Sequence, residues 1–484
     1  MKRKFVTNLG LIILLNLLIK PLWIFAIDIG VQNIVGPEEF GLYGSVLNFS
    51  FLLNILLDFG ITNYNNRNIS QNHQLLRKHF SNLVVMKFLM AILYAVITLS
   101  AALLLGYKGR QLNLLYLLIF NQFLISFALY LRSNIAGMQM HTVNSLISVL
   151  DRGLMIIFCA VLIWGRIEGL SMTIESFVYA QTAAYVMTAL ICFMIVAWKS
   201  KFPPMRFDSR FFLVILRQSL PYALLVLLMT GYTRLDAVML DRLLGPEGKT
   251  QVGIYIHGFR LFDAAYQFAL LFAVLLLPMF SKMIKERVPV NELTRLSALL
   301  LFVPSIILAV VAQVFRYEIM DLFYDEEAAE SARFFGIMMV AFIGMAGTII
   351  FGTLLTANGN LRQLNITSAM ALAINLILNL ILIPRYEAMG AAIACLAAQS
   401  FVGMSQYFIA ARRFRFGLDP TLLLKLIIFI ILVILMGWLA TSLPYLWWIE
   451  MFALIGVSLL LAFALSLVDL KAMIRLVLNG DKDS

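Results

Sequence analysis

The sequence predicts an all-α integral membrane protein with about fourteen transmembrane helices. We expect two parallel six-helix lobes around a central cavity, plus two C-terminal helices. Of the 484 residues, 62% are hydrophobic and only 13% are charged, and the mean hydropathy is +0.92. A soluble protein carries roughly a quarter charged residues. The composition therefore excludes soluble enzymes, nucleic-acid-binding modules and disulfide-stapled secreted domains.

Long apolar stretches recur along the whole chain and set the number of predicted helices. A membrane-spanning helix needs about 20 mostly apolar residues. Stretches of this kind occupy residues 9–31, 42–63, 82–106, 112–136, 143–165, 173–198, 212–240, 252–280, 296–318, 334–357, 363–383, 389–411, 421–442 and 445–469.

The distribution of Lys and Arg predicts the orientation of these helices. With a cytoplasmic N-terminus, the inner segments hold 23 of the 37 Lys and Arg residues, the outer loops hold 7, and the other 7 lie in or at the edges of spans. Cytoplasmic loops of membrane proteins carry an excess of Lys and Arg. We therefore expect a multi-pass protein with both termini cytoplasmic, and we attribute the net charge of +11 to this bias rather than to a polyanionic partner.

Two segments with similar sequences indicate an internal repeat. Gly-Pro-Glu-Glu-Phe-Gly-Leu-Tyr at 36–43 is similar to Gly-Pro-Glu at 245–247, which is followed by Gly-Ile-Tyr at 253–255. The first glycines are 209 residues apart and the Gly-x-Tyr motifs 212 apart. Six predicted spans separate the copies, so the two halves have the same orientation, as in transporters built from parallel repeats. We predict lobes at 1–200 and 201–415, and a two-helix hairpin with a cytoplasmic tail at 416–484.

Three cations lie deep inside predicted spans of the two repeats. Lys20 is near the middle of the first span, and Arg234 and Arg260 lie within the seventh and eighth spans. A charge in the bilayer centre costs about 2.5–3.5 kcal/mol on insertion scales, so such residues tend to line a wet cavity or pair with one another. Because Arg and Lys form charge-assisted hydrogen bonds with phosphate oxygens, we predict that the three cations converge on a shared cavity that suits a substrate bearing phosphate.

Acidic residues and prolines in the first two predicted spans of each repeat form a second set of candidates. We expect the carboxylates to line the cavity, couple transport to ions or pair with cations, and the prolines to kink helices that act as gates; these residues are Asp28, Asp58, Asp236 and Asp263, and Pro21 and Pro221. A purely structural interpretation pairs Arg234 with the neighbourhood of Asp236, Arg260 with Asp263, and Lys20 with Asp58. Asp241 and Arg242 lie next to the outer loop, where we expect them to be solvated.

No motif in the chain indicates an enzyme. The four histidines are scattered, and the three cysteines (Cys159, Cys192 and Cys395) lie in apolar runs with spacings unsuited to zinc. We therefore expect no catalytic residues, no metal site and no cofactor.

The motif residues give the chain a resemblance to a known family. The basic N-terminus, the 36–43 motif, Leu-Leu-Asp-Phe-Gly-Ile-Thr at 56–62, the stretch 236–246 and Met-Gly-Ala-Ala-Ile-Ala at 389–394 resemble Wzx-type oligosaccharide flippases. These are polysaccharide transporters of the multidrug/oligosaccharidyl-lipid/polysaccharide (MOP) superfamily. The resemblance covers essentially the whole chain. This chain differs from some members of the family in having Lys rather than Arg at position 20.

The resemblance implies a bacterial inner-membrane flippase that works by alternating access. Its substrate would be an undecaprenyl-pyrophosphate-linked oligosaccharide for surface polysaccharide such as the O-antigen of lipopolysaccharide. Implied partners are the lipid-linked oligosaccharide, membrane lipid, H+ or Na+ as a coupling ion, and the polysaccharide polymerase machinery. The family's cavity cations would correspond to Lys20, Arg234 and Arg260.

Two other functions are considered. A cation-coupled multidrug exporter of the same superfamily would bind organic cations and would need an anionic cavity, against which the three deep cations argue. A membrane glycan polymerase or ligase would be an enzyme, and such proteins generally need a sizeable outer domain, which the short loops of this chain do not provide.

Overall fold

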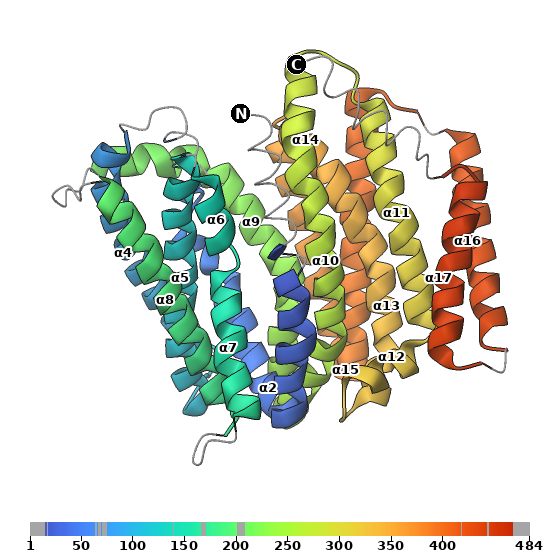
Figure 1. The fold of residues 1–484 in the computed structure, drawn as a ribbon, viewed down its shortest axis with the longest axis horizontal. Helices are drawn as coiled ribbons and strands as arrows, with labels where there is room; N and C mark the ends of the chain where they lie inside the picture. Colours follow the sequence, from blue (N-terminus) through green and yellow to red (C-terminus); the bar gives the residue numbers. More distant parts are fainter. Residues whose placement is uncertain are drawn as a thin grey trace. The chain divides into compact units, whose positions relative to one another are not determined.

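The computed structural model describes residues 15–467, except 17, 63, 64, 66–68, 70–74, 139, 166–170, 201–208, 418, 443 and 444. The start of the predicted first span and the C-terminal tail lie outside the described residues. The described part of the chain is helical and contains no strand, which confirms the predicted all-α class. The helices are η1 (Trp23–Asp28), α2 (Ile29–Leu52), η2 (Asn54–Leu57), α4 (Leu75–Leu104), α5 (Arg110–Gly137), α6 (His141–Ile147), α7 (Leu150–Trp164), α8 (Ile174–Ser200), α9 (Ser209–Leu243), η3 (Gly245–Glu247), α10 (Gly248–Lys285), α11 (Asn291–Val314), α12 (Arg316–Phe323), α13 (Ala328–Gly347), η4 (Thr348–Gly352), α14 (Thr353–Ala357), α15 (Leu361–Phe414), α16 (Pro420–Ala440) and α17 (Trp447–Ala464) (Figure 1).

Within the described residues, twelve helical segments are long and apolar enough to cross a membrane. Two of them contain a residue with non-helical backbone angles: Gly36 (φ 80°) in the segment Leu18–Leu52, and Glu387 (φ 51°) in Leu361–Phe414. The 54 residues of α15 would measure about 80 Å as one straight helix, more than twice the thickness of a bilayer core. Both breaks lie in predicted loops, so dividing each segment there gives the fourteen predicted spans.

The chain divides into two compact units, Met1–Ile256 and His257–Ser484, and the division falls inside α10. In the first unit, α5 packs against α2, α4 and α8, while α2 also packs against α9 and α7 packs against α8. These helices are apolar over most of their surface. In lipid, a helix satisfies its own backbone hydrogen bonds, so such sequences are stable as spans.

In the second unit, α13 packs between α11 and α15, and the C-terminal helices α16 and α17 pack against each other and against α11. Val303 and Ile307 of α11, Phe429 and Val433 of α16 and Leu454 of α17 are buried together in this packing. The hairpin α16–α17 therefore has a specific apolar interface with its own unit.

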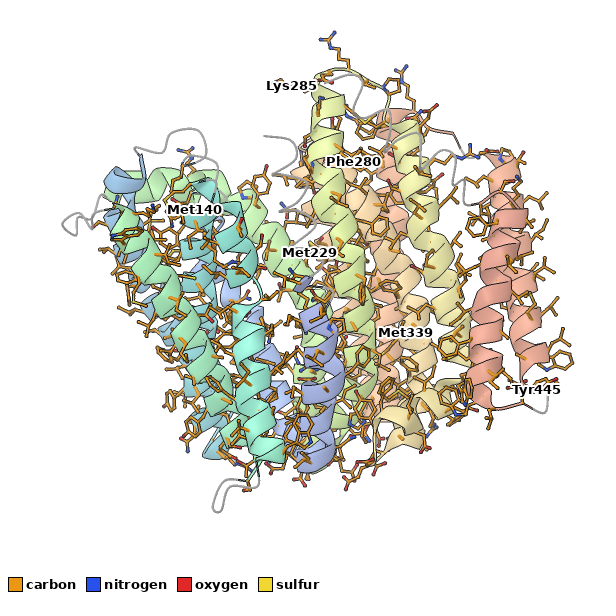
Figure 2. The ribbon with its side chains drawn as sticks, in the orientation of Figure 1. Met140, Met229, Phe280, Lys285, Met339 and Tyr445 are labelled. Carbon is orange, nitrogen blue, oxygen red and sulfur yellow. The ribbon has the colours of Figure 1, made fainter. Side chains whose placement is uncertain are left out.

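The outward faces of α16 and α17 carry large apolar side chains, as a lipid-facing surface requires. Ile431 and Trp438 of α16 and Phe452 and Leu460 of α17 are more than half exposed. Figure 2 shows side chains projecting from these two helices, with Tyr445 at the connection between them. Apolar surface of this kind is stable against acyl chains but not against water.

Candidate functional site

Lys20 and Asp28 lie at the two ends of an irregular segment in the first predicted span. Pro21 follows Lys20 directly, and from Trp23 to Asp28 the backbone forms a π-helix instead of an α-helix. A proline cannot donate a backbone hydrogen bond, and π turns are one way in which membrane helices adjust around it. Lys20 is half-buried. Asp28 is buried, and its Oδ2 accepts a hydrogen bond of 3.0 Å from Nε2 of Gln32.

Helix α9 places Arg234 and Asp236 in different surroundings, because residues two apart on a helix do not face each other. Arg234 is half-buried; its Nη1 lies 3.5 Å from Oδ1 of Asn48, and its guanidinium carbon lies 5.3 Å from the centre of the Phe51 ring. Asp236 is buried and accepts a 2.8 Å hydrogen bond from the Tyr255 hydroxyl. Arg234 thus faces α2, whereas Asp236 faces the start of α10.

Arg260 and Asp263 belong to the second unit, on α10, and both are half-buried. Lys20 and Arg234 belong to the first unit. The predicted convergence of the three cations on one cavity, and the pairing of Arg260 with Asp263, therefore stay predictions. Helix α9 continues through Pro221, so the gating role of this proline, like that of Pro21, also stays a prediction.

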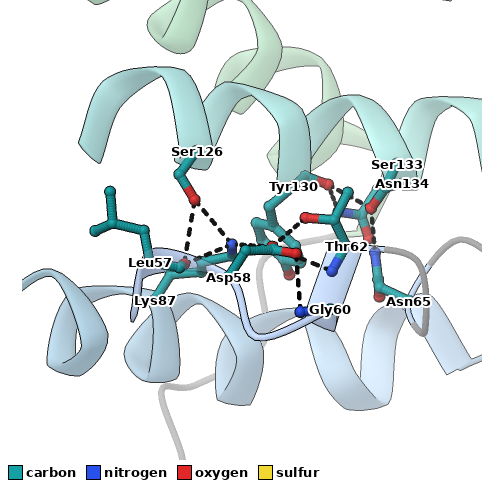
Figure 3. Close-up of polar contacts among 10 residues, drawn as sticks. All are labelled: Leu57, Asp58, Gly60, Thr62, Asn65, Lys87, Ser126, Tyr130, Ser133 and Asn134. Carbon is teal, nitrogen blue, oxygen red and sulfur yellow. Dashed lines mark hydrogen bonds and ion pairs between the residues drawn. The ribbon is translucent and has the colours of Figure 1, made fainter. Parts of the chain in front are cut away.

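Asp58 pairs with Lys87 of α4, which corrects the structural pairing with Lys20 considered from the sequence (Figure 3). The Lys87 side chain is 1% exposed, and its Nζ donates to Oδ1 of Asp58 (2.5 Å), the carbonyl of Leu57 (2.9 Å) and the hydroxyl of Ser126 (3.1 Å). An ammonium group has three donors, and each has an acceptor here. The pair sits where the helix is interrupted after η2.

The other contacts of Asp58 explain why the carboxylate is needed at this interruption. It accepts hydrogen bonds from the backbone N–H groups of Gly60 and Thr62, and from the Thr62 hydroxyl. Gly60 has a φ of 80°, so the chain turns sharply here before the helix resumes. Asp58 thereby satisfies backbone N–H groups at the start of the resumed helix, which have no partner within that helix. Lys87 was missed among the candidates, although a lysine five residues into an apolar run was a visible signal.

A second correction concerns Asp241, which was expected to be solvated. It is 7% exposed, and its Oδ2 accepts a 2.8 Å hydrogen bond from the Ser45 hydroxyl of α2. Arg242 lies 3.3 Å from the same oxygen, and its guanidinium carbon is 3.9 Å from the centre of the Tyr107 ring. The loop before α5 covers this end of α9, which the sequence pattern did not indicate.

In the described part of the chain, no group of three or more His, Cys, Asp and Glu residues is arranged to hold a metal ion. The three cysteines are buried. The polar groups that the structure brings together in the first unit form ion pairs and hydrogen bonds between helices, which favour helix association in a membrane.

Several solved structures have the same fold as this protein. The lipid II flippase MurJ in an inward closed conformation aligns with a TM-score of 0.71 at 15% identity, covering 96% of this chain and 100% of that chain. An inward-facing multidrug resistance MATE family transporter of the MOP superfamily aligns with a TM-score of 0.64 at 16% identity, covering 81% and 94%. A MOP superfamily transporter from Pyrococcus furiosus, described as having a binding pocket of reversed polarity, aligns with a TM-score of 0.58 at 16% identity, covering 85% and 95%.

The chain is therefore a multi-pass membrane protein with the fold of the MOP superfamily. Residues 5–284 match the family described as polysaccharide biosynthesis protein, and because this is more than half of its length the chain belongs to that family. The comparison with curated proteins gives no significant match.

Proposed function

We propose that this protein is a Wzx-type flippase that moves undecaprenyl-pyrophosphate-linked oligosaccharide units across the bacterial inner membrane by alternating access. The two repeats, 1–200 and 201–415, would form the lobes that alternate, and 416–484 would form the additional hairpin and tail. The transported units would serve surface polysaccharide synthesis, including O-antigen. Transport rather than catalysis agrees with the family and with the flippase and transporter neighbours.

The observation that carries the proposal is the presence of half-buried cations inside apolar helices of a polysaccharide biosynthesis protein. Arg234 in the first unit and Arg260 in the second each lie well within a helix long and apolar enough to cross a membrane, and Lys20 lies in the middle of the first span predicted from the sequence. A cation at this depth requires a polar partner or water. A pyrophosphate group supplies several anionic oxygens, which Arg can bind with two parallel hydrogen bonds.

A multidrug exporter is the second candidate, because MATE transporters are among the proteins of the same fold. Such a protein would bind organic cations and would favour a site dominated by carboxylates. The residues proposed for the site include the carboxylates Asp28, Asp236 and Asp263. Asp28 and Asp236 are buried and accept hydrogen bonds from Gln32 and Tyr255. The half-buried charges on α9 and in the first span are cations, and they favour the flippase.

Reconstitution in proteoliposomes tests the function directly. Purified protein and a fluorescent lipid-pyrophosphate oligosaccharide are combined, and the fraction of lipid accessible to an external quencher is followed with and without H+ or Na+ gradients. A flippase moves the lipid without changing its mass, whereas a polymerase or ligase changes the mass. Movement of organic cations with no movement of the lipid would establish the exporter instead.

Substitution of the deep cations tests the proposed site. Arg260→Ala and Arg234→Ala are each expected to reduce translocation at least about tenfold, because a charge-assisted hydrogen bond contributes roughly 1.5–3 kcal/mol. Abundance in the membrane should stay unchanged. Arg333→Ala serves as the control, since Arg333 is exposed on α13. Loss of the protein from the membrane in the Arg260 or Arg234 variant would assign that residue a structural role.

A further inference from the structure

The two copies of the Gly-x-Tyr motif touch each other in the structure. Gly41 lies on α2 and Gly253 near the start of α10, and both belong to the first unit. A Cβ atom placed on Gly41 would lie 1.8 Å from the carbonyl oxygen of Lys249 and 2.7 Å from the nitrogen of Gly253. A Cβ atom on Gly253 would lie 1.9 Å from the carbonyl oxygen of Pro37. The two helices therefore meet backbone to backbone, and a side chain at either position would separate them.

The repeat relates these contacts to each other. Gly41 and Gly253 are 212 residues apart, and so are their partners Pro37 and Lys249. The contact of Gly41 with Lys249 is thus the same contact as that of Gly253 with Pro37, made once by each copy. Gly44 and Ile256 are also 212 apart, and a Cβ atom on Gly44 would lie 2.0 Å from Cδ1 of Ile256. Equivalent residues that touch across two copies lie at a local two-fold axis, as in an isologous interface.

The tyrosines of the motif anchor each helix on its own side of this contact. The hydroxyl of Tyr43 exchanges hydrogen bonds with the side chain of Gln181 on α8, which belongs to the first repeat. The hydroxyl of Tyr255 donates to Asp236 on α9, which belongs to the second repeat. Each copy of the motif therefore provides a glycine that faces the other copy and a tyrosine that is tied to its own.

The contact between the copies is of a kind that can open and close. At the glycines it consists of van der Waals contact between helix backbones whose N–H and C=O groups bond within their own helices, so separation exposes little polar surface. Beside it, the hydrogen bond of 2.8 Å from Ser45 to Asp241 joins α2 to α9. This bond adds a polar interaction to the closed arrangement, and water can replace it when the helices separate.

We propose that the duplicated Gly-x-Tyr motif encodes a gate: α2 and α10 are closed against each other at Gly41 and Gly253, and they separate there to let substrate leave. The gate lies at the end of the helices nearest the Gly-Pro turns at 36–37 and 245–246, which the Lys and Arg distribution predicts to be the outer end. The inference rests on the proposed transport function. To that function it adds two gating residues, Gly41 and Gly253, and one hydrogen bond that stabilises the closed gate, from Ser45 to Asp241.

Alanine substitutions test the glycine contact. Gly41→Ala and Gly253→Ala should hold the gate open, whereas Gly30→Ala is the control, because a Cβ atom on Gly30, which lies before the break at Gly36, meets nothing within 4 Å. The reporter is a cysteine at Asn48, which is buried on α2. In intact cells, the rate of its reaction with a membrane-impermeant methanethiosulfonate should rise at least about tenfold in the two gate variants, because overpacking against backbone disfavours the closed state.

The double variant adds a sharper criterion. Gly41 and Gly253 make equivalent contacts between the same two helices, so either substitution alone should already separate them. The double variant Gly41→Ala with Gly253→Ala should therefore raise the labelling rate no more than either single change. The proposal would be wrong if the well-folded Gly41 and Gly253 variants were labelled as slowly as the Gly30 control. It would also be wrong if the labelling rate rose equally in the Gly41, Gly253 and Gly30 variants.

A reversible lock tests the gate without relying on the alanine variants. The pair Ser45→Cys and Asp241→Cys replaces the hydrogen-bonded side chains, and oxidation should close the gate covalently. Translocation by the pair should stop on oxidation and return on reduction, whereas the activity of each single cysteine variant, at whatever level it has, should not change between the two conditions. Undiminished transport by the oxidised pair would overturn the proposal. The alkylation experiment uses no substrate and the lock is applied to whichever compound the wild-type protein moves, so a wrong substrate assignment would leave both readouts interpretable.

Discussion

Two ion pairs in the first unit show how burial decides what a charge contributes. Lys87 is almost fully buried and bonds to Asp58, Leu57 and Ser126. Arg110 bonds to Glu39 and Glu175, but its side chain is 46% exposed. Water screens the exposed pairs, whereas the buried ammonium cannot be solvated if its partners are removed. The Arg110 and Lys87 ion pairs have nearly equal lengths, 2.5–2.6 Å, so burial and not distance makes the Lys87 pair the more important one.

Lys87→Met is expected to destabilise the protein by roughly 1–3 kcal/mol, because it removes the ammonium group that pairs with the Asp58 carboxylate and donates to the Leu57 carbonyl. Thermal unfolding in detergent measures the effect, and Lys282→Met on the exposed end of α10 is the control. Adding Asp58→Asn should restore part of the lost stability by removing the unpaired charge. A double variant less stable than Lys87→Met alone would contradict this account.

Arg110→Gln is expected to lower the free energy of unfolding by no more than about 1 kcal/mol. The difference from wild type should shrink further in 1 M salt, where the Debye length is about 3 Å. The unfolding temperatures of both proteins at low and high salt give the measurement. A large loss of stability that is insensitive to salt would contradict this account. It would mean that Arg110 stabilises the Gly-Pro turn although its side chain is exposed.

The residues of these pairs also show where sequence reasoning stops. Both Asp58 and Lys87 can be recognised as charges in apolar runs, but their sequence separation of 29 residues gives no information that they meet. Asp241 was assigned to a solvated rim because it is close to a loop in sequence. It is buried because Ser45, 196 residues away, packs against it. Charge and depth are local properties of a sequence, whereas partners depend on how distant helices pack.

At the scale of single helices, hydropathy predicted the elements well because the bilayer imposes one length and one polarity on every span. The predicted loops at 32–41 and 384–388 contain the breaks at Gly36 and Glu387. The π-helix after Pro21 and the interruption at 53–60 were not predicted in form. They depend on single backbone hydrogen bonds, and the mean hydropathy of a window of about twenty residues does not detect these.

The packing of α16 on α11 depends on one glycine. A Cβ atom on Gly437 would lie 2.9 Å from Cγ2 of Val314 and 3.3 Å from Cγ1 of Val310. We expect Gly437→Leu to push α16 away from α11 and to destabilise the protein by about 1–3 kcal/mol, the usual effect of overpacking. Thermal unfolding in detergent measures it.

Gly456→Leu on α17 is the matched control for this substitution, because a Cβ atom on Gly456 meets nothing within 4 Å. Both changes replace glycine by leucine in a membrane helix, so they alter helix propensity and hydrophobicity equally. Equal stability of the two variants would show that the hairpin adjusts its position without loss.

For the whole molecule, the number of membrane crossings follows from where α15 reverses. As one straight helix α15 would be about 80 Å long, so it must cross twice, with Glu387 at the turn. The loops on either side of successive helices should then alternate between the two faces of the membrane. Single cysteines at four exposed positions, Glu286, Glu326, Arg362 and Tyr386, sample four successive connections.

Labelling of these cysteines with a membrane-impermeant maleimide tests the topology. The Lys and Arg distribution predicts that Glu326→Cys and Tyr386→Cys react in intact cells, and that Glu286→Cys and Arg362→Cys react only after the membrane is permeabilised. The native cysteines are buried, so they should give little background. If Arg362→Cys and Tyr386→Cys react from the same side, α15 does not cross between them. The second predicted lobe would then have one crossing fewer than six, and the even number of spans from which we predict two cytoplasmic termini would be wrong.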